Sequence, residues 1–134
     1  MAAREQRVLV VDDDREIRSL VAGTLRRDGY TVLEAGDGPE ALDVAARLIP
    51  DLVLLDMTLP GMDGVEVARQ LKATPLLAMI PVVALSALTQ EAVQQRALAA
   101  GCARYLTKPC PPAALRDVVA QTLAGMGNRC SGGS

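Results

Sequence analysis

Five short strand-like runs alternate with segments of helical periodicity along this chain of 134 residues, and this alternation limits the possible fold more than any other feature. Runs of four or five mostly apolar residues suit strands that are buried on both faces. Strands that alternate with helices predict an α/β domain with one parallel sheet, helices on both faces and right-handed crossovers. The runs are Val8–Val11, Thr31–Glu34, Leu52–Leu55, Pro81–Leu85 and Arg104–Leu106.

Polar and small residues indicate where the helices between these runs begin. Asp13 or Asp14 can cap the first helix, Gly38 opens the second, and Asp63 and Thr89 can cap the third and fourth. The last helix begins at Pro111-Pro112. The side chains expected to face the core are Ile17, Leu20, Val21 and Leu25 in the first helix and Ala41, Leu42, Ala45, Ala46 and Ile49 in the second.

The length and the apolar content predict a single domain with a substantial core. Half of the residues are apolar, which argues against a disordered chain. We expect the folded domain to span residues 1–124. The remaining segment, 125–134, reads GMGNRCSGGS and has the composition of a flexible tail or linker.

Charge and aromatic content restrict the partners that the chain can have. The formal net charge is -2 and Tyr30 and Tyr105 are the only aromatic residues, so direct binding of nucleic acid is poorly supported. The longest apolar stretch, residues 75–88, is too short for a membrane span and is interrupted by Pro81. The three cysteines lack metal-ligand spacing and are interpreted as reduced thiols, which favours a cytoplasmic protein.

The absence of histidine excludes several kinds of chemistry. Without imidazole the chain cannot form a Ser-His or Cys-His nucleophile or a His-ligated metal site, and it cannot itself donate a phosphoryl group from histidine. Any chemistry must therefore use carboxylates, hydroxyls and lysine.

Polar residues follow the predicted strands at the points where the strands end. Asp12, Asp13 and Asp14 follow the first strand, Asp56 the third and Ser86 the fourth, and Lys108 lies just beyond the fifth. Parallel strands bring these residues to one edge of the sheet, where open sheets place their ligands. Clustered carboxylates repel one another unless a divalent cation lies between them, and oxygen ligands suit Mg²⁺. Our central hypothesis is that Asp56 accepts a phosphoryl group.

Four sequence motifs in order, VLVVDDD, LVLLDMTLPGMDG, VVALSAL and GCARYLTKP, resemble the receiver domain of two-component response regulators. The resemblance covers about residues 6–124. It implies a doubly wound, flavodoxin-like (CheY-like) fold of five parallel strands in the order 2-1-3-4-5.

The resemblance also implies a role for individual residues. Asp56 would be the phosphoacceptor. Asp13, Asp56 and the backbone carbonyl of Thr58 would bind Mg²⁺ directly, with Asp12 acting through metal-bound water. Lys108 and Ser86 would be the catalytic side chains that contact the phosphoryl group, and Ser86 and Tyr105 would form the switch.

The implied function is a phosphorylation-activated signalling switch. A histidine kinase or a histidine phosphotransfer protein would supply the phosphoryl group, and the domain would hydrolyse it slowly, acting as a signalling domain and not as an enzyme. An output domain or an effector protein would respond. Neither direct nucleic-acid binding nor membrane insertion is expected.

Simpler interpretations exist for several of these strand-end residues. Asp13 and Asp14 can be helix caps only, Ser86 and Thr107 ordinary hydroxyls at strand ends, Tyr105 a packing residue and Lys108 a solvated surface charge. A different function is also open, namely a Mg²⁺-dependent phosphatase of the haloacid-dehalogenase type. That class has a second acid two residues after its strand-end aspartate, where this chain has Thr58.

Overall fold

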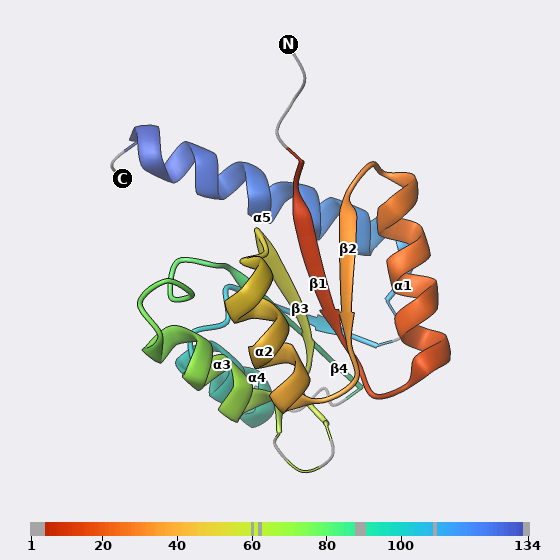
Figure 1. Cartoon of the computed structure of the whole chain (residues 1–134), viewed down its shortest axis with the longest axis vertical. Coiled ribbons are helices and arrows are strands. Elements are labelled where there is room, and N and C mark those ends of the chain that lie inside the picture. Colours follow the sequence, from red (N-terminus) through yellow and green to blue (C-terminus); the bar gives the residue numbers. More distant parts are fainter. Residues whose placement is uncertain (1–4, 60, 62, 88–90, 109, 133–134) are drawn as a thin grey trace.

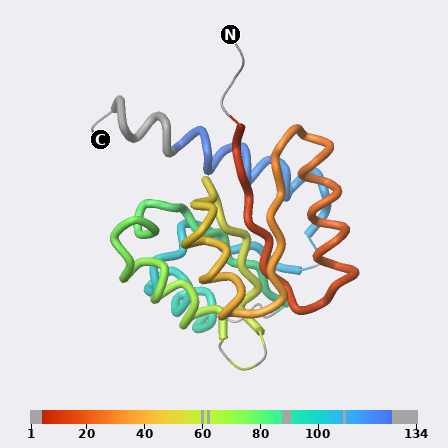
Figure 2. Tube along the Cα trace, in the orientation of Figure 1, coloured from red at the N-terminus to blue at the C-terminus, as the bar shows by residue number. Residues whose placement is uncertain are grey.

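The computed structural model describes residues 5–59, 61, 63–87, 91–108 and 110–132, with side chains described up to residue 125. Strands and helices alternate along the chain (Figure 1, and as a tube in Figure 2). The strands are β1 (Arg7–Val11), β2 (Thr31–Ala35), β3 (Leu52–Asp56), β4 (Val82–Ser86) and β5 (Arg104–Thr107). The helices are α1 (Arg15–Arg27), α2 (Gly38–Leu48), α3 (Gly64–Ala73), α4 (Glu91–Ala99) and α5 (Pro112–Gly132). The predicted α/β alternation is confirmed.

The five strands form one parallel sheet in the order β2-β1-β3-β4-β5. This order confirms the one that the receiver-domain resemblance implied. Helices α1 and α5 cover one face of the sheet, and α2, α3 and α4 cover the other (Figure 1). Because all strands run in the same direction, their carboxyl ends share one edge of the sheet.

Two apolar layers pack the helices onto the sheet, one on each face. Leu9 and Val11 of β1 belong to the layer under α2, α3 and α4, whereas Val8 and Val10 belong to the layer under α1 and α5. All four side chains are at most 1% exposed. Side chains alternate between the two faces of a strand, and both faces are covered here, which explains why the central strands read as continuous apolar runs.

Aspartate side chains cap three helices at their amino ends. Asp14 accepts hydrogen bonds from the backbone N–H groups of Glu16 and Ile17, and Asp63 accepts one from Glu66. The predicted caps Asp14 and Asp63 are therefore confirmed. Asp37 caps α2 in the same way, one residue before the predicted start of that helix. The predicted cap Thr89 lies outside the described residues.

Some predicted core positions on the first two helices are wrong. Leu20 is 72% exposed and Ile17 is 37% exposed, because the buried face of α1 is formed by Ala22 and Leu25. Ala46 is exposed on the outer side of α2. Ile49 is 42% exposed because it ends α2 in the left-handed backbone conformation, with φ 43°, and turns away from the core.

The last helix is longer than the sequence pattern suggests. Helix α5 continues to Gly132 and so runs through most of the segment 125–134 for which a tail or linker is expected. The use of that segment as a linker stays a prediction. Within the part of the chain that the structure describes, no helix has the length and apolar character needed to cross a membrane.

Candidate functional site

The carboxyl edge of the sheet gathers the strand-end residues as predicted. Asp56 ends β3 beside Leu85 of β4, and Ser86, which ends β4, pairs with Thr107 of β5. The backbone N–H of Lys108 donates to the carbonyl of Ser86 at 2.8 Å and so continues this pairing past the end of β5. The sheet register therefore fixes the positions of Asp56, Ser86 and Lys108 at the carboxyl edge of the sheet.

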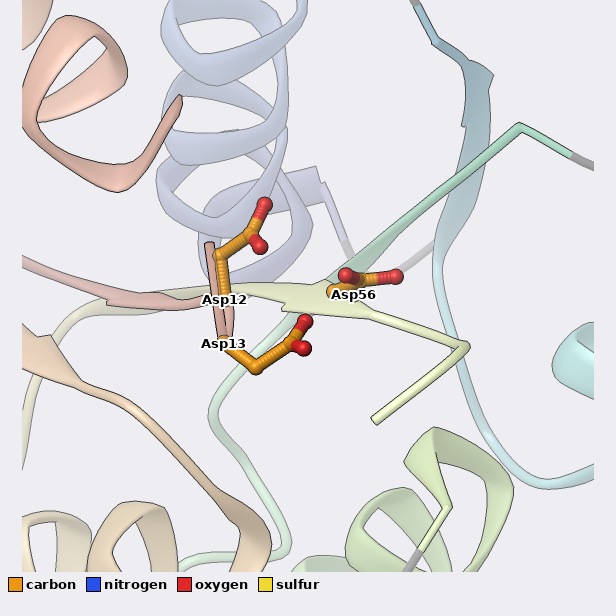
Figure 3. Close-up of side chains that lie close together, drawn as sticks. All are labelled: Asp12, Asp13 and Asp56. Atoms are coloured by element: carbon orange, nitrogen blue, oxygen red, sulfur yellow. The ribbon is translucent and has the colours of Figure 1, made fainter. Parts of the chain in front are cut away.

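Three carboxylates form an acidic cluster at this edge. Asp12 and Asp13 follow β1 and Asp56 ends β3, and one oxygen from each lies within 4.8 Å of the others (Figure 3). Asp12 and Asp56 are each only 3% exposed, whereas Asp13 faces solvent. Two of the three charges are therefore shielded from water and require compensation by nearby groups.

Lys108 provides part of this compensation. Its ammonium donates to Asp12 Oδ2 at 2.7 Å and to Asp56 Oδ2 at 3.2 Å. Burial by itself would lower the pKa of Lys108, but the hydrogen bond to Asp12 and the charges of Asp56 and Asp12 outweigh it, so the pKa is raised. The lysine is thus held in its charged form between two aspartates, and the interpretation as a solvated surface charge is wrong.

The other oxygen of Asp56 is held by the loop that follows it. Asp56 Oδ1 accepts hydrogen bonds from both the backbone N–H and the hydroxyl of Thr58, each at 2.9 Å. With Lys108 on Oδ2, both oxygens of the carboxylate have defined partners, so the side chain has a fixed orientation. The orientation of the Thr58 carbonyl toward a metal stays a prediction.

Asp13 and Asp14 have different roles in the structure. Asp14 is the helix cap, and its own backbone N–H donates to Asp12 Oδ1 at 2.9 Å. Asp13 does not cap α1, and its carboxylate joins the acidic cluster instead. The interpretation as a helix cap is therefore correct for Asp14 and wrong for Asp13.

Ser86 and Tyr105 lie on neighbouring strands close to this edge. Ser86 is fully buried, and Tyr105 is partly buried, pairs with Ala84 and packs against the layer under α2, α3 and α4. Ala87, directly after Ser86, is exposed. Ser86 thus ends its strand at the carboxyl edge of the sheet, while its contact with the phosphoryl group and the switching roles of both residues stay predictions.

The donor set of the acidic cluster fits Mg²⁺. It consists of carboxylate oxygens alone, the ligands that hard divalent cations prefer. Three carboxylates and one ammonium leave two negative charges, which a divalent ion would balance.

Gly64 is a residue of the site that the sequence interpretation missed. A Cβ atom at this position would lie 2.6 Å from the backbone oxygen of Asp56 and 2.6 Å from Cα of Met57. The first residue of α3 therefore has to be glycine for the helix to approach the backbone behind Asp56. The glycine directly after the cap Asp63 is the signal that could have indicated this close approach.

Comparison with known proteins agrees with this geometry. The family model of the response regulator receiver domain matches residues 8–120. The chain is 41% identical over 119 residues to the alkaline phosphatase synthesis transcriptional regulatory protein PhoP of Bacillus subtilis. The aligned residues cover 89% of this chain and 48% of PhoP. It is 45% identical over 103 residues to the response regulator PleD of Caulobacter vibrioides, and the aligned residues cover 77% of this chain and 23% of PleD.

Structural comparison gives the same result. The chemotaxis protein CheY4 of Vibrio cholerae superimposes with a TM-score of 0.85 at 31% identity, covering 88% of this chain and 98% of CheY4. The chain thus spans nearly all of CheY4, about half of PhoP and about a quarter of PleD. The family match, the strand order and the acidic edge of the sheet agree, and the chain belongs to the response regulator receiver domain family.

Proposed function

We propose that this domain is a phosphorylation-activated signalling switch in which Asp56 accepts the phosphoryl group. The observation that carries the proposal is the position of Asp56, which lies in contact with Lys108 and within 4.8 Å of oxygens from Asp12 and Asp13. A carboxylate held between a cation and a metal-binding pair of acids suits phosphoryl transfer, which needs positioning and charge stabilisation more than covalent machinery.

The chemical step is a displacement at phosphorus. A carboxylate oxygen of Asp56 forms a bond to phosphorus while the bond from phosphorus to the imidazole nitrogen of a donor breaks, and the imidazole leaves. Lys108, held in its charged form by Asp12 and Asp56, would contact the oxygens of the transferring group. The product is an acyl phosphate whose phosphoryl group carries roughly -1.5 to -2 charge, in place of the single negative charge of the Asp56 carboxylate.

A divalent metal ion held by these acids would complete the charge balance. Asp13, Asp56 and the backbone carbonyl of Thr58 would bind Mg²⁺ directly, and Asp12 would contact it through water. When bound, the ion stabilises negative charge on the transferring group. The exposed position of Asp13 beside the two buried acids leaves the cluster open to solvent on one side, as a reversibly bound ion requires.

Ser86 and Tyr105 would couple phosphorylation to a change of conformation. A hydrogen bond from Ser86 to the acyl phosphate contributes about 1.5–3 kcal/mol. Moving a population from about 1:99 to 99:1 takes roughly 5.5 kcal/mol. Ser86 alone is therefore insufficient, and Lys108, Mg²⁺ and the backbone after Ser86 would share the coupling. Complete loss of switching in Ser86→Ala, measured with an acyl-phosphate mimic, would contradict shared coupling.

The partners follow from the chemistry of the donor. The chain has no histidine, so a histidine kinase or a histidine phosphotransfer protein would carry the donor imidazole. An output domain or an effector protein would read the phosphorylated state, and slow autodephosphorylation would end the signal. We place this exchange in the cytoplasm, where such donors act.

A phosphatase of the haloacid-dehalogenase type is the alternative function, but the family match supports the receiver instead. Incubation with Mg²⁺ and a small phosphodonor separates the two. A receiver takes up one phosphoryl group per chain in the wild type and none in Asp56→Asn. Labelling of Asp56→Asn to the same stoichiometry, or sustained turnover of phosphate esters by the wild type, would overturn the proposal.

A further inference from the structure

We infer that Arg18 is a positioning residue for the metal-binding acids, an inference that rests on the proposed function. Arg18 lies on α1, six residues after Asp12, and its side chain is 18% exposed. Its Nη1 donates a hydrogen bond to the backbone carbonyl of Asp12 at 2.9 Å.

This contact acts on the peptide that joins the two acids after β1. The carbonyl of Asp12 belongs to the planar peptide bond between Asp12 and Asp13, so holding its oxygen fixes the orientation of that plane. The plane sets the direction in which both side chains leave the backbone. Arg18 therefore acts on Asp13 indirectly, through the backbone of Asp12. Among the residues that the structure describes, Arg18 makes its hydrogen bonds to Asp12 and Glu34 and not to Asp13.

Arg18 completes a set of contacts that leaves Asp12 little freedom. The N–H of Asp12 donates to the carbonyl of Ala35 at 3.1 Å, its Oδ1 accepts from the N–H of Asp14, and its Oδ2 accepts from Lys108. The carbonyl is the remaining polar group, and Arg18 holds it. The backbone and the side chain of Asp12 are thus fixed from separate elements.

The guanidinium is itself held from the opposite side. Arg18 Nε donates to Glu34 Oε1 of β2 at 3.1 Å, which ties α1 to the edge strand. A Cβ atom on Gly36 would lie 3.1 Å from the same Nη1 that contacts Asp12, so the β2–α2 loop closes over the guanidinium. A rigidly held planar cation, with one edge on Glu34 and the other on the Asp12 carbonyl, is suited to fixing the peptide between the acids.

Arg26 supplies a matched control within the same helix. It also binds Glu34, with Nη2 at 3.3 Å from Oε2, but its other contact is the carbonyl of Val32 and not that of Asp12. Replacing Arg26 removes an ion pair to the same glutamate without releasing the peptide at the site. A difference between the two arginine variants therefore reports on the contact to Asp12.

The test is the dissociation constant of Mg²⁺, measured by NMR titration of backbone amides in the full chain without any phosphodonor. We expect Arg18→Gln to raise this Kd on the order of tenfold. This value is the lower end of the roughly 10- to 100-fold loss of metal affinity that follows removal of a group that orients metal ligands. Arg18→Lys, which keeps one cationic donor, should fall between Arg18→Gln and the wild type. Arg26→Gln should leave the Kd unchanged. Equal Kd values for Arg18→Gln and Arg26→Gln would overturn the inference.

A second variant keeps the test decisive if Arg18→Gln does not fold. Gly36→Ala retains the arginine but crowds its Nη1, and should raise the Mg²⁺ Kd in the same direction; an unchanged Kd in folded Gly36→Ala then overturns the inference. Failure of the proposed function is recognised separately. Suppose that the wild type binds Mg²⁺ and that Arg18→Gln raises the Mg²⁺ Kd as expected, but that the wild type takes up no phosphoryl label at Asp56. This result would refute phosphoacceptance and support the positioning role.

Discussion

The ammonium of Lys108 lies 2.7 Å from Asp12 Oδ2, although the two residues are 96 positions apart in the chain. This ion pair, together with the contact to Asp56, places the positive charge of the β5–α5 loop against two buried carboxylates. It balances part of the negative charge of the acidic cluster.

Removing Lys108 should therefore destabilise the domain. Lys108→Met leaves Asp12 and Asp56 buried without their countercharge, and we expect a loss of about 1–3 kcal/mol in the free energy of unfolding without Mg²⁺. Urea unfolding followed by circular dichroism in EDTA measures this loss. Arg116→Gln is the control, because its pair with Asp28 is half exposed and should contribute less than about 1 kcal/mol. Equal losses in both variants would contradict the assignment.

Mg²⁺ should stabilise the folded chain, and Asp13 should be needed for this effect. At free Mg²⁺ of about 100 times the Kd, we expect a gain of about 2.7 kcal/mol over the metal-free protein. Asp13→Asn removes one ligand but also one of three clustered negative charges, so it should be at least as stable as the wild type in EDTA. Thermal unfolding in EDTA and at increasing Mg²⁺ tests both statements, and a full Mg²⁺ effect in Asp13→Asn would refute the ligand role.

Two glycine-to-alanine substitutions should have opposite effects on stability. At Gly64 the added methyl group would collide with the backbone of Asp56 and Met57, so we expect a loss of about 1–3 kcal/mol and slower labelling of Asp56. At Gly23, inside α1, nothing lies within 4 Å of the added group, and we expect a gain of about 0.5–1 kcal/mol. Chemical unfolding of both variants measures the difference, and a neutral Gly64→Ala would show that α3 can move away from Asp56.

Stability should fall at alkaline pH because of a buried thiol. Burial raises the pKa of Cys102 from 9.0 to about 11, against a smaller opposing effect of Lys72. Because the folded-state pKa is the higher one, the unfolded chain loses this proton first, and stability decreases as the pH rises from 9 to about 11, by up to about 2–3 kcal/mol. The raised pKa values of Tyr30 and Lys108 add a further decrease above pH 10 and 10.5.

Urea unfolding between pH 8 and 11 measures this decrease, and Cys102→Ala should remove most of the part between pH 9 and 10. Cys110, which is less buried, also has a raised pKa, so Cys110→Ala is the matched control with the smaller effect. A Cys102→Ala profile as steep as that of the wild type would contradict the assignment.

Much of the site could be predicted because strand ends are visible in the sequence. The abrupt change from Leu55 to Asp56 marks the carboxyl end of a buried strand, and parallel pairing brings such ends together.

The buried faces of the helices were less predictable. Leu25 is buried as predicted, but Ile17 and Leu20, which were expected on the same buried face of α1, are exposed, and Ala22 is buried instead. Periodicity shows which residues share a face and not which face meets the core.

The amino-acid sequence by itself determined the strand–helix alternation, the parallel sheet and the set of polar residues at its carboxyl edge, because these follow from apolar periodicity and local capping. The tertiary structure alone decided that Lys108 contacts Asp12 as well as Asp56, that Asp14 and not Asp13 caps α1, and that Arg18 holds the peptide between the two acids. Such contacts depend on how the ends of separate elements lie against one another. Hydrogen bonds require distances near 3 Å, and the spacing of residues along one element does not contain that information.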